Sequence, residues 1–288
     1  KAESIYKKIL DNNSKYLVIE KDLITHDYKK LIEKIRDIEQ LRVDYYYHRL
    51  YPYNELAAQL IGFTNYNNQG KHGIEGFFNK TLKGSESLVE FNKTASGKTI
   101  LSQNTTNLPN NGSDIILTID IKMQEILQNQ LRNAYSQNKA KSANGIILNP
   151  YNGEILAIAS LPDFDLNHYN KLPKDSAQYY YLNRPVSSAY EPGSTFKIVC
   201  FTDAIENDLN NKKEKYFCEN GLYKGKYIDP FKDHDSGYDS LYFDEIFSNS
   251  SNIGTIKIFQ DLHMESFYNR MQKFGFGIKS NISLMDEH

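Results

Sequence analysis

The sequence predicts an α+β protein built from two unlike blocks. Residues 1–110 mix helical and strand patterns with polar turns, and residues 111–288 carry apolar strands followed by helices. Strands and helices grouped in this way, without a regular βαβ alternation, favour the α+β class. The boundary is predicted at Pro109-Asn-Asn-Gly112, a cluster of turn residues between two periodic segments.

Length and composition narrow the class of protein. A chain of 288 residues is long enough for about two domains. Its hydrophobic content of 40% and charged content of 24% suit a globular protein. The formal net charge of −2 argues against nucleic-acid binding, which needs a basic surplus. No apolar run reaches the roughly 18 residues of a membrane-spanning helix.

The ends of the chain have the character of a fragment. The sequence does not begin with Met, opens inside a helical pattern, and closes without a stop signal. We therefore expect it to be part of a longer protein, so that a missing anchor or signal peptide carries no information. Cys200 and Cys218 cannot form a disulfide framework, and we expect two buried thiols, with a single bridge as the alternative.

The first block is predicted to contain a helix, a strand and a second, short helix. Apolar residues spaced three and four apart predict a helix over residues 27–39. Alternation predicts a strand over residues 41–47, and residues 54–60 have the pattern of a short helix. A glycine-rich stretch at 70–76 follows, and residues 86–111 are typical of short strands and polar turns.

The second block begins with a strand, a helix and a hairpin. A strand is predicted over residues 115–119, and Asp120 is the expected cap of the helix after it. Two apolar strands, 145–148 and 154–159, are joined by Asn149-Pro-Tyr-Asn-Gly153, which is a strong hairpin signal. Residues 161–190 are predicted to form a tyrosine-rich loop, and helices are expected over residues 194–206 and 253–262.

The sharpest chemical feature lies at the start of the helix 194–206. Pro192-Gly193 predicts a turn, and Ser194 and Lys197 are three residues apart, so they share one helix face. A serine needs an adjacent base to become a nucleophile, and a lysine in a dry site can be neutral enough to serve. The alternative is a helix-capping serine with a solvated lysine one turn later. If the pair is catalytic, Ser194 Oγ should lie within hydrogen-bond reach of Lys197 Nζ.

A second polar cluster precedes the helix 253–262. Ser250 and Asn252 are two residues apart, and both side chains can point into one cleft. A hydroxyl there can relay a proton, and a carboxamide can hold a substrate amide. The alternative is another polar cap of a helix.

Three other clusters are weaker candidates. The seven histidines are scattered without metal-binding spacing, so no metal or other cofactor is expected. Asp233-His-Asp235 could orient a base in a Ser-His-Asp triad, but a solvated loop is favoured because no G-x-S-x-G motif accompanies it. Asp163 and Asp165 could form a carboxylate pair, but they lie in a polar turn on alternate sides.

Ser-x-x-Lys followed by Ser-x-Asn resembles the penicillin-recognising serine transpeptidases and β-lactamases. Longer stretches in both blocks resemble class B, monofunctional penicillin-binding proteins of the cell-division type, over nearly the whole chain. In the first block these are Arg49-Leu-Tyr-Pro52, Ala57-Ala-Gln-Leu-Ile-Gly-Phe-Thr-Asn65 and Gly73-Ile-Glu75. In the second they are Leu117-Thr-Ile-Asp120, Gly153-Glu-Ile-Leu-Ala157, Asn183-Arg-Pro-Val186, Glu191-Pro-Gly-Ser-Thr-Phe-Lys197 and Phe274-Gly-Phe-Gly277.

The resemblance implies a role for each site residue. Ser194 would be the acylated nucleophile, and its backbone N–H would be half of the oxyanion hole. Lys197 would be the general base, Ser250 would pass the proton toward the leaving group, and Asn252 would bind the substrate amide. Residues 1–110 would be a non-catalytic, dimerisation-like pedestal that folds independently, and residues 111–288 an incomplete transpeptidase domain with an antiparallel sheet flanked by helices.

One departure from the family pattern affects activity. The third motif, K-T-G or K-S-G, is absent, and Gly97-Lys-Thr99 has the wrong order in the wrong block. We expect that motif to lie beyond His288 in the complete protein. Because losing one oxyanion donor costs about 10²–10³ in rate in a model protease, the chain alone is expected to be weak or inactive.

The function implied is that of a peptidoglycan D,D-transpeptidase, acting on stem peptides in septal wall synthesis and inhibited by β-lactams. The resemblance further implies a bacterial inner-membrane protein with a single anchor and a periplasmic body. Its partners would be a membrane-embedded glycan polymerase and division proteins. Alternatives are an elongation-type transpeptidase, a serine β-lactamase or D,D-carboxypeptidase, and a penicillin-sensing or scaffold module without turnover.

Overall fold

The computed structural model describes residues 2–10, 17–19, 33–35, 38, 41, 48–85, 91–93, 99–101, 110–211, 213–224, 230–234 and 237–285. The chain divides into two compact units, Lys1–Tyr47 and His48–His288. The described elements are helices and antiparallel two-stranded sheets, so the predicted α+β class is confirmed. Within these residues, no helix has both the length and the apolar character needed to cross a bilayer.

The first unit is described mainly by one helix, α1 (Ala2–Leu10), which carries Glu3 in its first turn. A carboxylate there complements the positive end of the helix dipole. The predicted helix over residues 27–39 and strand over 41–47 fall for the most part outside the described residues.

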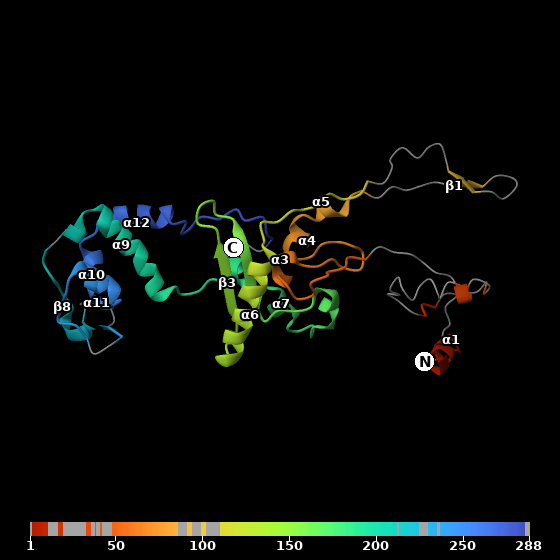
Figure 1. Ribbon diagram of the computed structural model, residues 1–288, viewed down its shortest axis with the longest axis horizontal. Helices are drawn as coiled ribbons and strands as arrows, with labels where there is room; N and C mark the ends of the chain where they lie inside the picture. Colours follow the sequence, from red (N-terminus) through yellow and green to blue (C-terminus); the bar gives the residue numbers. More distant parts are fainter. Residues whose placement is uncertain are drawn as a thin grey trace. The chain divides into compact units, whose positions relative to one another are not determined.

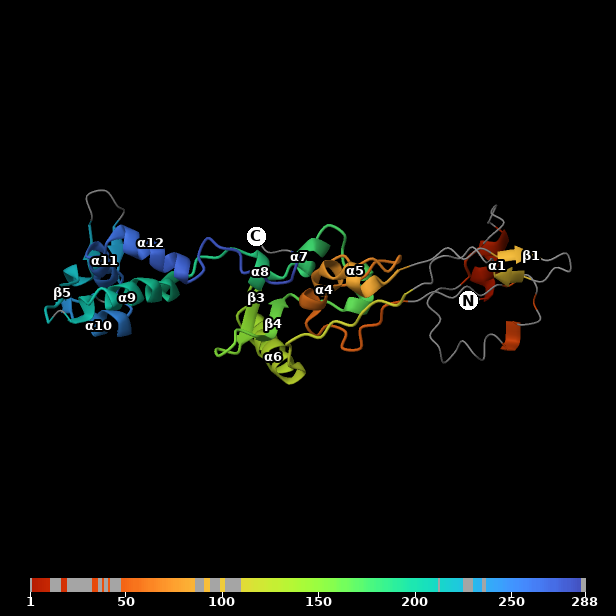
Figure 2. The same ribbon diagram turned by 90° about the horizontal axis from the view of Figure 1, so that it is seen from above.

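A hairpin and a helix form the centre of the second block. Strands β3 (Ala143–Leu148) and β4 (Ile155–Leu161) pair antiparallel, as the Asn149–Gly153 turn predicted. Helix α6 (Ile121–Gln137) begins at Asp120, whose carboxylate accepts a hydrogen bond from the Met123 N–H at 2.9 Å. This cap confirms the predicted start of the helix. Both views of the ribbon show α6 lying along the hairpin (Figures 1 and 2).

The predicted strand over residues 115–119 is wrong. This segment pairs with no strand among the described residues. Two hydrogen bonds join this segment and the residue after it to β4: Thr118 Oγ1 donates to the Ile155 carbonyl at 2.6 Å, and the Asp120 N–H donates to the Leu156 carbonyl at 2.9 Å. Its apolar alternation reflects packing of Leu117 and Ile119 near Ile158 rather than a ladder of hydrogen bonds.

Residues 48–85 hold three short helices: α3 (Ala58–Ile61), α4 (Gly73–Phe77) and α5 (Asn79–Lys83). The short helix predicted over 54–60 is therefore present but begins later, after a series of turns. Arg49 and Glu75 form an ion pair, with 2.7 Å between Nε and Oε1. Burial raises the pKa of Glu75, and the Arg49 charge opposes that rise. Strands β1 (Phe91–Lys93) and β2 (Thr99–Leu101) pair antiparallel farther along the chain.

The tyrosine-rich segment 161–190 is not a plain loop. It contains the 3-10 helix η1 (Leu166–Lys171) and the α-helices α7 (Ala177–Tyr181) and α8 (Arg184–Ser187). Its aromatic rings pack on the first block. The rings of Phe63 and Tyr169 stack with their centroids 4.1 Å apart, and Phe164 meets Phe63 edge-on.

Residues 51–63 share their core with the second block. Tyr51, Ala58 and Phe63 pack with Phe164 and Leu166 in one buried cluster. Ala57 and Leu60 pack with Ile158 and Leu284 in another. This shared packing argues against the expectation that residues 1–110 fold independently, because part of their core lies in residues 158–284.

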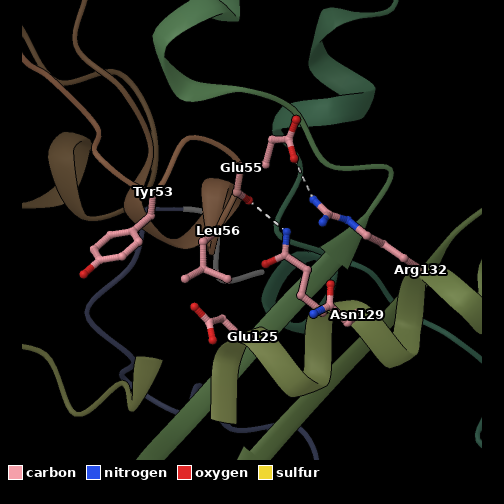
Figure 3. A pocket seen from close by; sticks show the side chains of 7 residues that line it. Tyr53, Glu55, Leu56, Glu125, Asn129 and Arg132 are labelled. Atoms are coloured by element: carbon pink, nitrogen blue, oxygen red, sulfur yellow. Dashed lines mark hydrogen bonds and ion pairs between the residues drawn. The ribbon is translucent and has the colours of Figure 1, made fainter. Parts of the chain in front are cut away.

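Polar side chains complete this contact, and we call the group Glu55, Ala57, Gln128, Arg132 and Asp163 the seam. Gln128 accepts from the Ala57 N–H at 3.1 Å and donates to the Glu55 carbonyl at 2.8 Å. Both Gln128 and Arg132 donate to Asp163 Oδ2 at 2.8 Å. Arg132 Nη2 lies 2.9 Å from Glu55 Oε2, and both residues line a cavity of about 260 Å³. Figure 3 shows the Glu55 carboxylate directed at Arg132.

A helical cluster follows, and it carries the chemical motifs. Its helices are α9 (Lys197–Glu206), α10 (Phe243–Ser248), α11 (Asn252–Gln260) and α12 (Met264–Lys273), which gather together in both views (Figures 1 and 2). Val199, Phe201, Ile246, Ile253 and Ile258 form its core. Helices α10 and α12 were not predicted. The helix predicted over 253–262 is confirmed as α11.

Small elements connect these helices. They are the 3-10 helices η2 (Gly193–Phe196), η3 (Leu209–Asn211) and η4 (Glu219–Gly221), and the strand pairs β5 (Tyr216–Phe217) with β8 (Ser240–Leu241) and β6 (Leu222–Tyr223) with β7 (Phe231–Lys232). Cys200 and Cys218 are both buried and unbridged, so the expected free thiols are confirmed.

One glycine sets the distance between two helices of this cluster. A Cβ added to Gly254 in α11 would lie 2.6 Å from Ile246 Cγ1 in α10, and two other atoms of that side chain would lie within 2.9 Å. Only a residue without a side chain permits this approach. The start of α11, which carries Asn252, is thereby pressed onto the end of α10.

Candidate active site

Ser194 lies in the 3-10 turn η2, immediately before α9. The predicted helix over 194–206 is therefore present, with its first turn wound more tightly than an α-helix. The Ser194 side chain is exposed. Pro192 occupies the capping position of η2 and no side chain caps that turn, so Ser194 does not have the capping role of the alternative interpretation. Its hydroxyl is left for other chemistry.

Lys197 begins α9 and turns toward the loop between α10 and α11. Its Nζ donates to the Ser250 carbonyl at 2.6 Å, to Ser250 Oγ at 3.1 Å and to Asn252 Oδ1 at 2.7 Å. This half-buried lysine is not the solvated side chain of the alternative interpretation. Burial lowers the pKa of Lys197 below the ordinary value of a lysine, and the negative charge of Asp233 opposes that shift.

The structure brings three of the four predicted site residues together. Lys197, Ser250 and Asn252 converge, although at least 53 residues separate the lysine from the other two. Ser194 lies one helical turn from Lys197. No hydrogen bond joins Ser194 Oγ to Lys197 Nζ in the part of the chain that the structure describes. The expected contact between nucleophile and base is therefore the one element of the geometry not formed here.

Ser250 lies in the short connection between α10 and α11 and has φ of 53°. A non-glycine residue in this left-handed region stores strain, which commonly accompanies functional sites. Its N–H donates to the Phe247 carbonyl at 3.1 Å, while its carbonyl and hydroxyl both face Lys197. The turn thus presents two oxygen atoms of one residue to a single ammonium group.

Ser251 and Asn252 anchor that connection to α11. Ser251 is 1% exposed and caps the helix, accepting from the Gly254 N–H at 3.0 Å. Asn252 uses both ends of its carboxamide: Oδ1 accepts from Lys197, and Nδ2 donates to the Lys232 carbonyl at 2.8 Å. The middle serine is thus structural, as the cap interpretation proposed for this cluster, whereas the residues on either side of it face the lysine.

Asp233, which the sequence raised only as part of a disfavoured Ser-His-Asp triad, belongs to the site in a different way. The expected solvated loop is wrong for this residue, which is 8% exposed. Its Oδ2 accepts from Ser251 Oγ at 3.0 Å, and its Oδ1 accepts from the backbone N–H of Asn252 at 2.5 Å and of Ile253 at 3.2 Å. The polar sequence around Asp233 resembles an exposed turn, and its partners lie 18 to 20 residues away. No local pattern could have indicated them.

The other candidate clusters have structural roles. Asp163 belongs to the seam, whereas Asp165 accepts from the Asn167 N–H at 2.8 Å and pairs with His168. These two carboxylates do not act on a common group. Two cavities, lined by residues 51–61, 117–132 and Leu166, contain none of the four predicted site residues.

The geometry at Lys197 fits either charge state of the lysine. As an ammonium ion it has three N–H donors for the three oxygen atoms around it. As a neutral amine it keeps two donors, and the Ser250 hydroxyl can donate to its lone pair instead. Either way, a proton can pass between Lys197 and Ser250 at 3.1 Å. Ser194, one turn away, is the exposed hydroxyl that such a pair can activate.

Two protein-family models match the chain. Residues 144–288 match the penicillin binding protein transpeptidase domain, and residues 1–117 match the penicillin-binding protein dimerisation domain. The first match contains all four predicted site residues and also Asp233. The second contains the Arg49–Glu75 ion pair and the residues 51–63 that pack on the second block.

Individual proteins resemble the chain over most of its length. Stage V sporulation protein D of Bacillus subtilis (strain 168) is 33% identical over 294 residues, which cover 99% of this chain and 44% of that protein. The peptidoglycan D,D-transpeptidase FtsI of Buchnera aphidicola subsp. Schizaphis graminum is 31% identical, covering 83% of this chain and 40% of its own length.

The fold is likewise similar to a solved structure. Penicillin binding protein 3 from Mycobacterium tuberculosis, complexed with aztreonam, superposes with a TM-score of 0.69 at 26% sequence identity, covering 83% of this chain and 49% of that one. The chain thus spans less than half the length of each of these three proteins.

Proposed function

The chain belongs to the penicillin-binding protein transpeptidase family, and from this we propose that it is part of a peptidoglycan D,D-transpeptidase of the cell-division type. The observation that carries the proposal is the half-buried Lys197, held by Ser250 and Asn252 one turn from an exposed serine. The names of the relatives, a stage V sporulation protein and FtsI transpeptidases, favour the division type over the elongation type.

In the first half of the reaction, Ser194 Oγ attacks the carbonyl of the D-Ala-D-Ala bond of a stem peptide. Lys197 takes the hydroxyl proton, and its lowered pKa favours the neutral amine that can accept it. The Ser194 N–H lies in the first turn of η2, where a helix leaves its N–H groups without intrahelical acceptors, so it can donate to the developing oxyanion. The carbon–nitrogen bond breaks, and the terminal D-Ala leaves with a proton delivered through Ser250.

In the second half, the amine of a neighbouring stem peptide attacks the Ser194 ester. The same groups act in reverse: Ser250 and Lys197 remove the amine proton, and Ser194 leaves as a hydroxyl. Asn252 Oδ1 faces Lys197, and its carboxamide is the group that would hold the substrate amide. A β-lactam would acylate Ser194 by the first half alone. None of these proposed steps uses a cofactor or a metal.

The remaining features of the proposal concern the whole protein. Residues 1–110 would be a non-catalytic pedestal, supported by the match of residues 1–117 to a dimerisation domain. The boundary at residue 110 stays a prediction. The body would lie in the periplasm on a single inner-membrane anchor, beside a glycan polymerase and division proteins. A β-lactamase or D,D-carboxypeptidase is less favoured because such hydrolases do not need the pedestal, and a sensor or scaffold without turnover has no specific support.

The test uses the full-length gene product that carries this chain, incubated with a fluorescent penicillin. We expect covalent labelling of the wild type, with the adduct on Ser194 by intact-mass and peptide mass spectrometry. Ser194→Ala should abolish labelling, and Thr195→Ala, a change at the neighbouring exposed residue, should retain it. Full labelling of Ser194→Ala, or an adduct on Ser250, would refute the assigned roles.

A further inference from the structure

The buried carboxylate of Asp233 holds the start of α11. This residue follows β7, and both of its oxygen atoms are used: one by the Ser251 hydroxyl, the other by two consecutive backbone N–H groups. Those N–H groups belong to the first turn of α11, where they have no intrahelical acceptor. A carboxylate at that position also complements the helix dipole. The bonds therefore fix Ser251 and Asn252 relative to β7.

The same strand holds the other face of the loop. The Lys232 carbonyl accepts from Asn252 Nδ2, so two consecutive residues of the chain, Lys232 and Asp233, bind the side chain and the backbone of Asn252. The rotation of the Asn252 carboxamide is thereby set, with Oδ1 directed at Lys197 Nζ. Ser250, which directly precedes these anchored residues, is presented to the same nitrogen atom.

We propose that Asp233 is a positioning residue of the reaction, whose buried carboxylate fixes the loop carrying Ser250 and Asn252 and keeps a negative charge next to the Lys197 base. The inference rests on the proposed function, since it concerns the same site. It adds a residue that has no direct role in the chemistry. Asp233 acts through Lys197, Ser250 and Asn252, which the proposed reaction uses directly.

The charge of Asp233 has an effect separate from its hydrogen bonds. Its negative charge raises the pKa of Lys197, against the larger lowering by burial. Among the described residues, other titratable groups near Asp233 include the Cys218 thiol, whose pKa is raised mainly by burial, and the flanking Lys232 and His234. Lys257 of α11 pairs instead with Glu219, at 2.6 Å.

A matched pair of substitutions separates positioning from stability. Asp233→Asn removes the charge and at least one hydrogen bond with little change in volume. Asp203→Asn makes the same change at a fully buried aspartate of α9, which accepts from Ser266 of α12, outside the loop, at 2.8 Å. In the full-length protein, the rate of acylation by a fluorescent penicillin is measured against pH and penicillin concentration, together with the melting temperature.

Both variants are expected to lower the melting temperature. Asp233→Asn alone should slow acylation at saturating penicillin by roughly 10- to 100-fold, because small misplacement of reacting groups costs about that much. Its pH–rate profile should also shift: without the negative charge the pKa of Lys197 falls further, so the acidic limb moves to lower pH. Asp233→Glu, which keeps the charge on a longer side chain, should be slow with the acidic limb unmoved.

Each outcome has one meaning. Acylation by Asp233→Asn at the wild-type rate with an unmoved acidic limb would overturn the inference while leaving the proposed function intact. If Asp233→Asn does not fold, Asp233→Glu decides: a wild-type rate in that variant would overturn the positioning role. A wild-type protein that takes no label on Ser194 would instead refute the proposed function, and the inference with it.

Discussion

The seam and the loop held by Asp233 are both fixed by buried polar side chains, but the two regions have different roles. In the seam, Gln128 and Arg132 of α6 bind both backbone and side chains of residues 55–57 and Asp163. In the loop, Asp233 binds the backbone and side chains of residues 251–253. Both replace regular secondary structure with a buried polar side chain that reaches across the chain.

The two regions differ in whether every functional side chain is hydrogen-bonded to the rest of its group. Every member of the seam has a partner in another member. The loop at Lys197 is bonded on its buried side through Asp233 and Ser251, but Ser194 on the exposed side makes no bond to the lysine. The difference indicates that the seam completes the scaffold, whereas the site keeps one hydroxyl free for a substrate. Substitutions in the two regions should therefore affect different measurements.

After the loss of the Ser194 nucleophile itself, the largest effect is expected at Lys197. Lys197→Ala should slow acylation by a fluorescent penicillin by roughly 10²–10⁴-fold, since a general base contributes about that much. The melting temperature should change little, because the lysine is only half-buried and its partners Ser250 and Asn252 reach solvent. Stopped-flow labelling and a thermal melt of the full-length protein give the two numbers. A large drop in melting temperature with normal labelling would reverse the assignment of scaffold and site.

The opposite pattern is expected in the seam. Gln128→Leu removes partners of the Ala57 N–H, the Glu55 carbonyl and Asp163, and a buried polar group left unpaired costs about 1–3 kcal/mol. We expect the free energy of unfolding to fall by about 2–4 kcal/mol, with acylation by the folded fraction unchanged. Urea titration measures the first quantity.

A neighbouring residue supplies the control for this substitution. Asn129 follows Gln128 on α6, lines the cavity in Figure 3 and is exposed. Asn129→Leu should change stability by less than about 0.5 kcal/mol. Equal losses in the two variants would mean that the seam contributes no more than any other surface of the helix.

The comparison also explains which parts of the molecule the sequence predicts. The Asp120 cap, the 149–153 turn and the Ser194–Lys197 spacing each depend on residues a few positions apart, so local patterns predict them. The strand expected over residues 115–119 fails because alternation cannot reveal whether a partner strand is present. Gln128 was missed, and Asp233 was assigned to a solvated loop, because a buried polar side chain is indistinguishable from an exposed one until its distant partner is known.

A third substitution affects both measurements at once. In Gly254→Ala the added methyl group would overlap Ile246, so α11 must move away from α10. Overpacking of this kind costs about 1–3 kcal/mol of stability. Because Asn252 begins α11, acylation should also slow, by less than in Lys197→Ala. A variant with wild-type stability and labelling would show that the two helices adjust without strain.

The smallest effect is expected for alkylation of the buried thiols. Their reactivity tests whether the helical cluster α9–α12 stays folded in native protein. Burial raises the pKa of Cys200 to about 11, and the Asp203 carboxylate adds to that rise. Alkylation needs the thiolate, so at pH 8 only about one molecule in a thousand would be reactive even if reagent reached the sulfur. Iodoacetamide followed by mass spectrometry should find Cys200 unmodified in native protein and fully modified in urea. Rapid native alkylation would show that α9 opens, and that its site is held less firmly than the seam.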